Sequence, residues 1–178
     1  MNFFRKILLI VLSISMLAAC GFHLRAPVDL SVEITPVFIE QSGADNVLDR
    51  ELRSLLSQSG KNDLTQTKSE AKSVLKIVSA KEKKRVVAVD DRGRARQYDL
   101  SYILRYSLTG KNIPQSGDDN ISVLNLKRSV IFDPDNVLAI GHEAETLYND
   151  MRKDSARLIL QRLQTLGSQT QGEQSVGQ

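Results

Sequence analysis

Apolar and polar residues alternate without interruption between residues 98 and 108. The apolar positions are Tyr98, Leu100, Tyr102, Leu104, Tyr106 and Leu108, and the intervening positions are Asp99, Ser101, Ile103, Arg105 and Ser107. Because successive side chains of a β-strand point to opposite faces, a period of two predicts a strand with one buried face. This is the strongest structural signal in the chain.

Three other stretches are typical of strands. Residues 32–40 are β-branched and apolar, and Pro36 within them predicts an edge position, because proline cannot donate to a neighbouring strand. Residues 72–89 predict a longer strand that ends in a turn over 90–93. A further alternating run, interrupted by Arg128, has its apolar positions at Leu124, Leu126, Val130 and Phe132.

Two stretches have the spacing of amphipathic helices. The apolar stripe of the first is Val47, Leu48, Leu52, Leu55 and Leu56. Asp45 or Asn46 is expected to cap its start, and Gly60 to end it. The second covers residues 143–166, with a stripe of Leu147, Met151, Leu158, Ile159, Leu163 and Leu166. Residues 167–178 are mostly Gly, Ser, Gln and Thr with little to bury, which predicts a disordered tail.

The order of these elements, β-α-β-β-β-α, predicts an α+β two-layer sandwich. Two helices would cover one face of a four-stranded mixed sheet, in a single domain over residues 31–166. The helix between the first two strands permits them to pair in parallel, whereas the later hairpins are antiparallel.

The first twenty residues have the layout of a secretory signal. Two basic residues give a positive start, residues 7–17 are mostly apolar, and small residues lead to Cys20. That apolar run is too short for a membrane-spanning helix, which needs about 20 residues. The sequence LAAC at 17–20 also resembles the lipobox of bacterial lipoproteins, which predicts a signal peptide over residues 1–19 and a lipid on Cys20.

Cys20 is the only cysteine, so a lipid on its sulfur leaves no thiol for a disulfide, a metal or a nucleophile. Residues 20–30 then form a lipidated tether that reaches at most about 33 Å. By resemblance to lipoproteins in general, Gly21 implies export to the outer membrane. There are two alternatives to the lipoprotein interpretation of residues 1–20. One is an ordinary secretory signal in which the cysteine occurs by chance, and the other is a short helix of the protein core.

The net charge of the full chain is +3, from 24 Lys and Arg against 21 Asp and Glu. Removing residues 1–19 takes away Arg5 and Lys6 and no acidic residue, which leaves 22 basic residues against 21 acidic ones and a net charge of +1. An excess this small, in an exported protein, gives no reason to expect nucleic acid as a partner.

The sequence offers little to a catalytic mechanism. His23 lies in the tether, and His142 stands beside Glu143 and Glu145 at the start of the second helix, where the helix dipole favours carboxylates. Neither a nucleophile elbow nor a phosphate-binding glycine loop is present in the sequence. We therefore expect no catalytic residue, metal or cofactor, and keep a periplasmic hydrolase that uses His142 as a minor hypothesis.

Basic residues gather between 81 and 96. They are Lys81, Lys83, Lys84, Arg85, Arg92, Arg94 and Arg96, against the acidic Glu82, Asp90 and Asp91. One interpretation is that they solvate a hairpin and protect a strand edge. The other is that they bind an anionic group such as phosphate, which arginine holds with two parallel hydrogen bonds. An outer-membrane location favours the second interpretation, because the lipid there is densely phosphorylated.

Several segments, in this order and spacing, resemble the LptE family of lipopolysaccharide-assembly lipoproteins. They are residues 20–25 at the lipid site, 93–98 before the alternating strand, 132–134 with 137–139, and 150–157 in the closing helix. The resemblance implies a sandwich of two helices on a four-stranded sheet, without a catalytic site. It also implies a plug inside the outer-membrane barrel LptD, which assists the folding of that barrel and binds lipopolysaccharide during its delivery to the outer leaflet.

The resemblance further implies which basic residues touch the lipid. Those before Tyr98 are Arg92, Arg94 and Arg96, with Lys84 and Arg85 in the same basic stretch. A second basic group is expected after Ala139, but Ile140-Gly141-His142 stands there, so only the hairpin is carried over.

The predicted function is thus a lipid-anchored outer-membrane subunit of the lipopolysaccharide translocon, facing the periplasm and inside the barrel lumen of its partner. The alternative is a lipoprotein binding module of another envelope machine, for barrel assembly or phospholipid transport.

Overall fold

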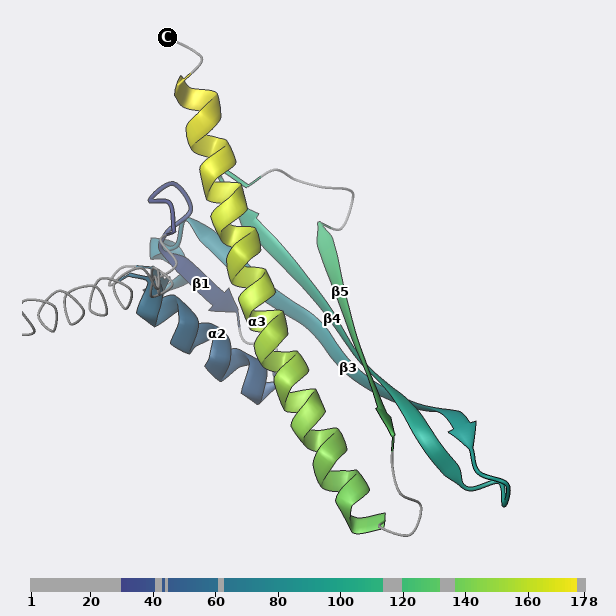
Figure 1. Ribbon diagram of the computed structural model, residues 1–178. Coiled ribbons are helices and arrows are strands. Elements are labelled where there is room, and N and C mark those ends of the chain that lie inside the picture. Colours follow the sequence, from purple (N-terminus) through teal and green to yellow (C-terminus); the bar gives the residue numbers. More distant parts are fainter. Residues whose placement is uncertain are drawn as a thin grey trace, which may run out of the picture.

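The fold is a five-stranded sheet with two helices on one of its faces (Figure 1). The computed structural model describes residues 30–40, 43, 45–60, 63–113, 120–131 and 137–175, without the side chains of 137–140 and 170–175. Its elements are β1 (Val37–Glu40), α2 (Asn46–Ser59), β2 (Leu64–Thr65), the 3-10 helix η1 (Lys68–Glu70), β3 (Ser73–Val89), β4 (Ala95–Gly110), β5 (Ile121–Ile131) and α3 (Val137–Ser175). The predicted signal peptide, Cys20, His23 and Phe132 lie outside the described residues.

The strand order β2-β1-β3-β4-β5 confirms the α+β class and the mixed sheet. β1 pairs in parallel with β3, as the intervening helix permits, and β3, β4 and β5 are antiparallel. The sheet has one strand more than predicted, because the two-residue β2 pairs in parallel with β1. A strand of two residues carries no alternation by which the sequence could reveal it.

The segment before β1 differs from the prediction. β1 begins at Val37 and lies between β2 and β3, so the edge position predicted from Pro36 is wrong. Pro36 stands just ahead of the strand, where its missing N–H costs no ladder bond, and its carbonyl accepts a hydrogen bond from Lys72 N at 2.9 Å. Leu30 and Ile34, in the same segment, are buried in the core.

Helix α2 begins and ends where its sequence signals predict. Asp45 is the N-cap, and its Oδ1 accepts hydrogen bonds from the backbone N–H groups of Val47 and Leu48, both at 3.0 Å. Gly60 follows the last turn. The buried residues, one turn apart, are Leu48, Leu52 and Leu56.

Helix α3 is longer than the predicted 143–166 at both ends. Its buried face follows a spacing of three or four residues: Ala144, Tyr148, Met151, Ser155, Ile159, Leu163 and Leu166. Leu158, which was predicted to be buried, is offset from this stripe and 41% exposed. Residues 167–175 continue the helix where a disordered tail was predicted. Gly167 begins this extension, and a Cβ there would lie 2.6 Å from Cβ of Ser31, so its packing accounts for the glycine.

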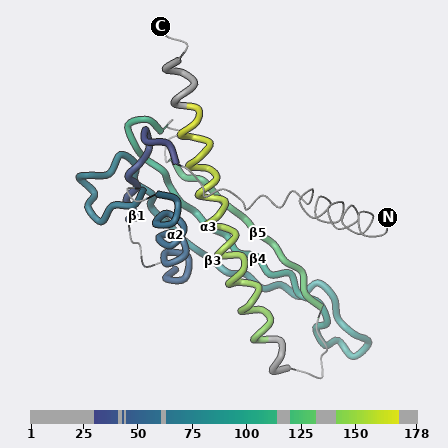
Figure 2. The backbone as a smooth tube through the Cα atoms, turned by 60° about the vertical axis from the view of Figure 1, so that its left-hand side comes forward, coloured from purple at the N-terminus to yellow at the C-terminus, as the bar shows by residue number. Residues whose placement is uncertain are grey.

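The alternation in β4 decides which face meets the helices. Leu100, Tyr102 and Leu104 are fully buried beneath α2 and α3, which confirms the prediction. Arg128, which interrupts the apolar positions of β5, reaches Asp154 of α3 at 2.9 Å. Past the end of β5, β3 and β4 continue as a two-stranded hairpin that projects away from α3 (Figures 1 and 2).

Candidate functional site

The candidate site is the projecting end of the β3–β4 hairpin. Its turn is built by Asp90, whose Oδ1 accepts hydrogen bonds from the backbone N–H groups of Arg92 and Arg94 at 3.0 and 2.8 Å. Gly93 has a φ of +77°, a conformation that favours glycine, and its N–H donates to the carbonyl of Asp90. The turn predicted over 90–93 is therefore confirmed, with a fixed backbone.

The five predicted lipid-contacting residues all lie on this hairpin, in different settings. Arg92 and Arg96 are exposed, and neither forms an ion pair with any residue that the structure describes. Arg94 Nε lies 2.8 Å from Asp90 Oδ2, which ties this side chain to the turn. Arg85 lies 3.4 Å from Asp99, and Lys84 Nζ lies 4.1 Å from the centre of the Tyr98 ring.

The acidic residues of the same stretch form no ion pair with Arg92 or Arg96. Asp91, exposed next to Arg92, has no ion pair with any described residue. Asp90 accepts from Arg94 through both backbone and side chain, and these hydrogen bonds hold the pKa of Asp90 below its usual value. Glu82 belongs to the helix-facing side of β3, where it pairs with Arg152. The hairpin end therefore presents a surplus of positive charge.

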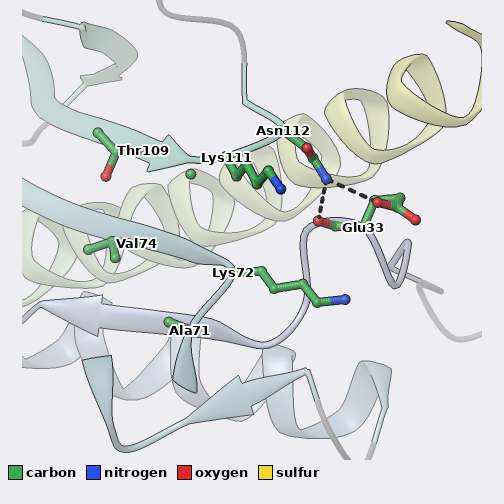
Figure 3. Close-up of a pocket in the computed structure, with 8 residues that line it drawn as sticks. Glu33, Ala71, Lys72, Val74, Thr109, Lys111 and Asn112 are labelled. Carbon is green, nitrogen blue, oxygen red and sulfur yellow. Dashed lines mark hydrogen bonds between the residues drawn. The ribbon is translucent and has the colours of Figure 1, made fainter. Parts of the chain in front are cut away.

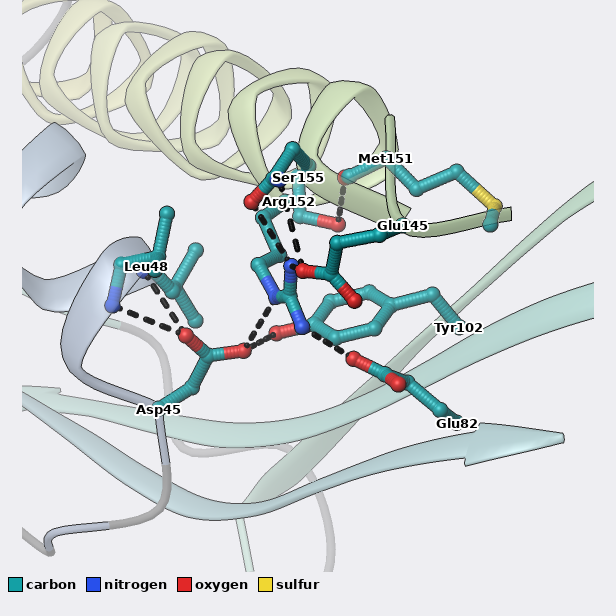
Figure 4. A network of polar contacts seen from close by, with 10 residues as sticks. Asp45, Leu48, Glu82, Tyr102, Glu145, Met151, Arg152 and Ser155 are labelled. Carbon is teal, nitrogen blue, oxygen red and sulfur yellow. Dashed lines mark hydrogen bonds and ion pairs between the residues drawn. The ribbon is translucent and has the colours of Figure 1, made fainter. Parts of the chain in front are cut away.

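Arg152 is the centre of a polar network between the helices and the base of the hairpin (Figure 4). Its side chain is 11% exposed and reaches acceptors from α2, α3 and β3. Its partners are Asp45 Oδ2 at 3.0 Å, Glu145 Oε1 at 3.0 Å, Asn149 Oδ1 at 2.8 Å and the carboxylate of Glu82. Asp45 also accepts from the Tyr102 hydroxyl at 2.9 Å, so the same carboxylate caps α2 and joins β4 to α3.

The network shifts the pKa values of its members. Burial and the nearby Asp45 carboxylate raise the pKa of Tyr102, so this phenol stays a hydrogen-bond donor. Burial acts to lower the pKa of Arg152, but the hydrogen bond to Glu145 and the charges of Glu82 and Asp45 outweigh it and raise the pKa. Arg152 therefore remains charged and paired.

This network fixes the hairpin where it leaves the helices. Glu82 is held by Arg152, and the Tyr148 hydroxyl donates to the carbonyl of the next residue, Lys83, at 2.9 Å. The sequence gives no local sign of this contact, because Asp45 and Arg152 are 107 residues apart. The one available hint is that a charged residue, Arg152, directly follows the buried Met151 on α3.

His142 is exposed on α3, and no group of three or more His, Cys, Asp or Glu in the described part of the chain could hold a metal ion. An open cleft of about 570 Å³ lies at the other end of β3 and β4, where they meet the segment before β1 (Figure 3). There Asn112 donates to Glu33 and Lys72 to the carbonyl of Val32, contacts that join this segment to the sheet.

None of the described helices is both long and apolar enough to span a bilayer.

Comparisons with known proteins agree with the resemblance. The model of the family described as LptE, lipopolysaccharide-assembly, matches residues 30–163. The LPS-assembly lipoprotein LptE of Photorhabdus laumondii is 28% identical over 174 residues, 96% of this chain and 93% of that protein. The protein of the same name from Yersinia enterocolitica is 26% identical over 161 residues, 89% of this chain and 75% of that protein.

A solved lipoprotein structure has a similar fold. The solution NMR structure of an uncharacterized lipoprotein B from Nitrosomonas europaea superposes with a TM-score of 0.66 at 25% identity, over 83% of this chain and 93% of that one. The family match covers the segment before β1, the whole sheet, α2 and most of α3, including the basic hairpin and Arg152. The chain therefore belongs to the LptE family of lipopolysaccharide-assembly lipoproteins, which is not a known enzyme family.

Proposed function

We propose that this protein is the lipid-anchored outer-membrane subunit of a lipopolysaccharide translocon. It would sit as a plug inside a β-barrel related to LptD, assist the assembly of that barrel and bind lipopolysaccharide for delivery to the outer leaflet. The observation that carries the proposal is the basic hairpin end, which projects away from the helices on a member of this family.

The hairpin has the chemistry to hold phosphate. A guanidinium group donates two parallel hydrogen bonds to a phosphate, and such charge-assisted bonds are stronger than neutral ones. Neither Arg92 nor Arg96 forms an ion pair with a described carboxylate, although Asp91 precedes Arg92 in the chain. Asp90 fixes the turn that carries Arg92, and Arg96 lies in β4 just after it, so little backbone order must be gained when a ligand binds.

The anchor and the partner complete the proposal. Several acyl chains on Cys20 would hold the chain on a membrane without a spanning helix, at about 0.8 kcal/mol for each buried methylene. The barrel would enclose the folded domain of residues 31–166. Arg152 and Asp45 are largely buried, and the ion pairs of Arg152 with Asp45, Glu82 and Glu145 would keep that domain rigid rather than contact a ligand.

The proposal is tested by affinity purification of the tagged protein, expressed with its signal sequence, from detergent-solubilised outer membranes. We expect one large β-barrel at equal stoichiometry, identified by mass spectrometry, together with lipopolysaccharide. A variant with Arg92→Glu and Arg96→Glu should keep the barrel and recover less lipopolysaccharide, since only the anion contacts are reversed. Recovery of a different envelope machine, or of no barrel, would overturn the proposal.

A further inference from the structure

The sheet has a second face that no described helix covers. On β3, β4 and β5 it is formed by every second residue from Ser79 to Arg85, from Asp99 to Arg105 and from Val123 to Ser129, and we call it the open face. Its orientation follows from strand geometry: Leu100, Tyr102 and Leu104 point into the core, so the residues between them point the other way.

The register of the strands brings cations together on the open face. Ser101 of β4 lies opposite Lys83 of β3 on one side and opposite Lys127 of β5 on the other, so these three residues form one row. In the next row, Arg85 of β3 lies opposite Asp99 of β4. The basic residues of the face are Lys81, Lys83, Arg85, Arg105 and Lys127, and its one acidic residue is Asp99. The face therefore carries a net charge of +4, five positive charges against one, in a mature chain of +1.

Most of this charge is available to a ligand. Arg85 lies 3.4 Å from Asp99, but Lys81, Lys83, Arg105 and Lys127 are exposed and have no ion pair with any part of the chain that the structure describes. Alternate residues of a strand are about 6.6 Å apart, so the cations form a grid rather than a single pocket. A grid of this kind suits a ligand with several separated negative charges.

The composition of the open face favours a phosphorylated saccharide over a protein partner. The centres of protein interfaces are depleted in lysine and enriched in aromatic residues, whereas this face has lysine and, among its positions, no aromatic side chain. Ser101, Asn125 and Ser129 stand between the cations and offer hydroxyl and amide groups, which can hydrogen-bond to sugar hydroxyls.

We propose that the open face binds the phosphorylated saccharide of lipopolysaccharide, as a second anion site separate from the hairpin turn. This inference rests on the proposed function, because it takes lipopolysaccharide as the ligand. Arg92 and Arg96 lie beyond the end of the grid, in and after the turn, so a lipid with charges at both its lipid and sugar ends can reach both sites.

The test uses the full mature protein in detergent micelles. The probe is the core oligosaccharide of lipopolysaccharide, freed of its lipid with its phosphates intact, and binding is measured by calorimetry. The variant Lys83→Glu with Lys127→Glu should bind at least about tenfold more weakly, a loss of about 1.4 kcal/mol. The control Lys153→Glu with Arg162→Glu makes the same change in charge at exposed positions of α3 and should bind like the wild type.

Two further arms complete the test. The dephosphorylated oligosaccharide should bind weakly to every variant, and Arg92→Glu with Arg96→Glu should change oligosaccharide binding by less than about threefold, about 0.65 kcal/mol. Unchanged binding by the Lys83 and Lys127 variant, an equal loss in the control, or tight binding of the dephosphorylated probe would overturn the inference.

The competing hypothesis is that a negatively charged surface of a partner protein binds to the open face. Loss of the copurifying barrel in the Lys83 and Lys127 variant, with oligosaccharide binding intact, would assign the face to that protein and overturn the inference. The calorimetric test contains no barrel, so its failure is separate from failure of the translocon proposal, which the affinity purification decides.

Discussion

Arg152 and Arg92 are both arginines near the same hairpin, in opposite situations. Arg152 is buried at the base and surrounded by the carboxylates of Asp45, Glu82 and Glu145. Arg92 is exposed at the tip and has no ion pair with a described residue. The chain thus surrounds one arginine with three carboxylates and leaves the other without an ion pair to any described residue.

This difference separates stability from recognition. A buried cation among carboxylates must stay paired, because an uncompensated buried charge is costly. An exposed cation without a carboxylate contributes little to folding and keeps its charge for a ligand. The following four predictions test this division, from the largest expected effect to the smallest.

Removing the buried cation should have the largest effect on stability. Arg152→Ala leaves three carboxylates near one another without their shared partner. We expect a loss of about 3 kcal/mol in the free energy of unfolding, at the lower end for buried pairs because Glu82 and Glu145 are partly exposed. Urea denaturation followed by circular dichroism measures this loss.

Arg157→Ala is the matched control, because Arg157 is an exposed arginine of the same helix that pairs with Asp154. It should change stability by less than about 0.5 kcal/mol. Equal stability of the Arg152 and Arg157 variants would show that the network does not hold the hairpin base.

Asp45 combines two roles that substitution can separate. Asp45→Ala removes both the cap of α2 and the charge that faces Arg152, and should cost about 2 kcal/mol. Asp45→Asn keeps an oxygen that can accept from Val47 and Leu48, so its cost should be about 1 kcal/mol smaller. Thermal and urea unfolding measure the difference, and equal costs for both variants would mean that the cap contributes nothing.

Reversing the exposed cations should act on binding alone. Arg92→Glu with Arg96→Glu should weaken the binding of lipopolysaccharide at least about tenfold, since each lost charge-assisted bond is worth about 1.5–3 kcal/mol. The melting temperature should stay unchanged, because neither side chain pairs with a described residue. Unchanged binding with an unchanged fold would favour the interpretation that these residues solvate the hairpin. Arg94 is left in place because it pairs with Asp90.

The smallest effect is a local pH dependence of the turn. The pKa of Asp90 is lowered in the folded protein, so its contribution is fully present above the ordinary value of 3.8 and is lost as the pH falls through the folded-state pKa. The Asp90 carboxyl, followed by NMR, should therefore titrate below 3.8, and the amide signals of Arg92 and Arg94 should change with it. Titration at or above 3.8 would contradict the hydrogen bonding seen in the turn.

The sequence predicted those parts of the fold whose cause is local. The alternation through Tyr102, the cap at Asp45 and the turn before Arg94 each depend on a few adjacent residues, and all three are confirmed. The position of the basic hairpin followed from the same signals. The ends of α3 were not predicted, because past Leu166 the residues Gly167, Ser168 and Gln169 carry no apolar stripe that would reveal a helix.

The features that the sequence did not predict need the tertiary structure. Asp45 and Arg152 meet only when α2 and α3 pack against the same face of the sheet. The open face needs the register of three strands, which brings Lys83 and Lys127 into one row. Residue spacing along a single strand contains no information about either contact.

The length of β3 sets the distance between the two ends of the hairpin. Ser73, at one end, is near the first described residues of the chain, and Val89, at the other, leads into the turn, so the 17 residues of β3 separate them by about 50 Å. Whatever the turn holds is therefore kept at a set distance from the point where the chain enters the domain. Because side chains alternate, a change of this distance that keeps the two faces needs steps of two residues, about 7 Å at a time, or a one-residue bulge. The strand β3 already contains such register shifts, between Ile77 and Ser79 and between Val86 and Ala88.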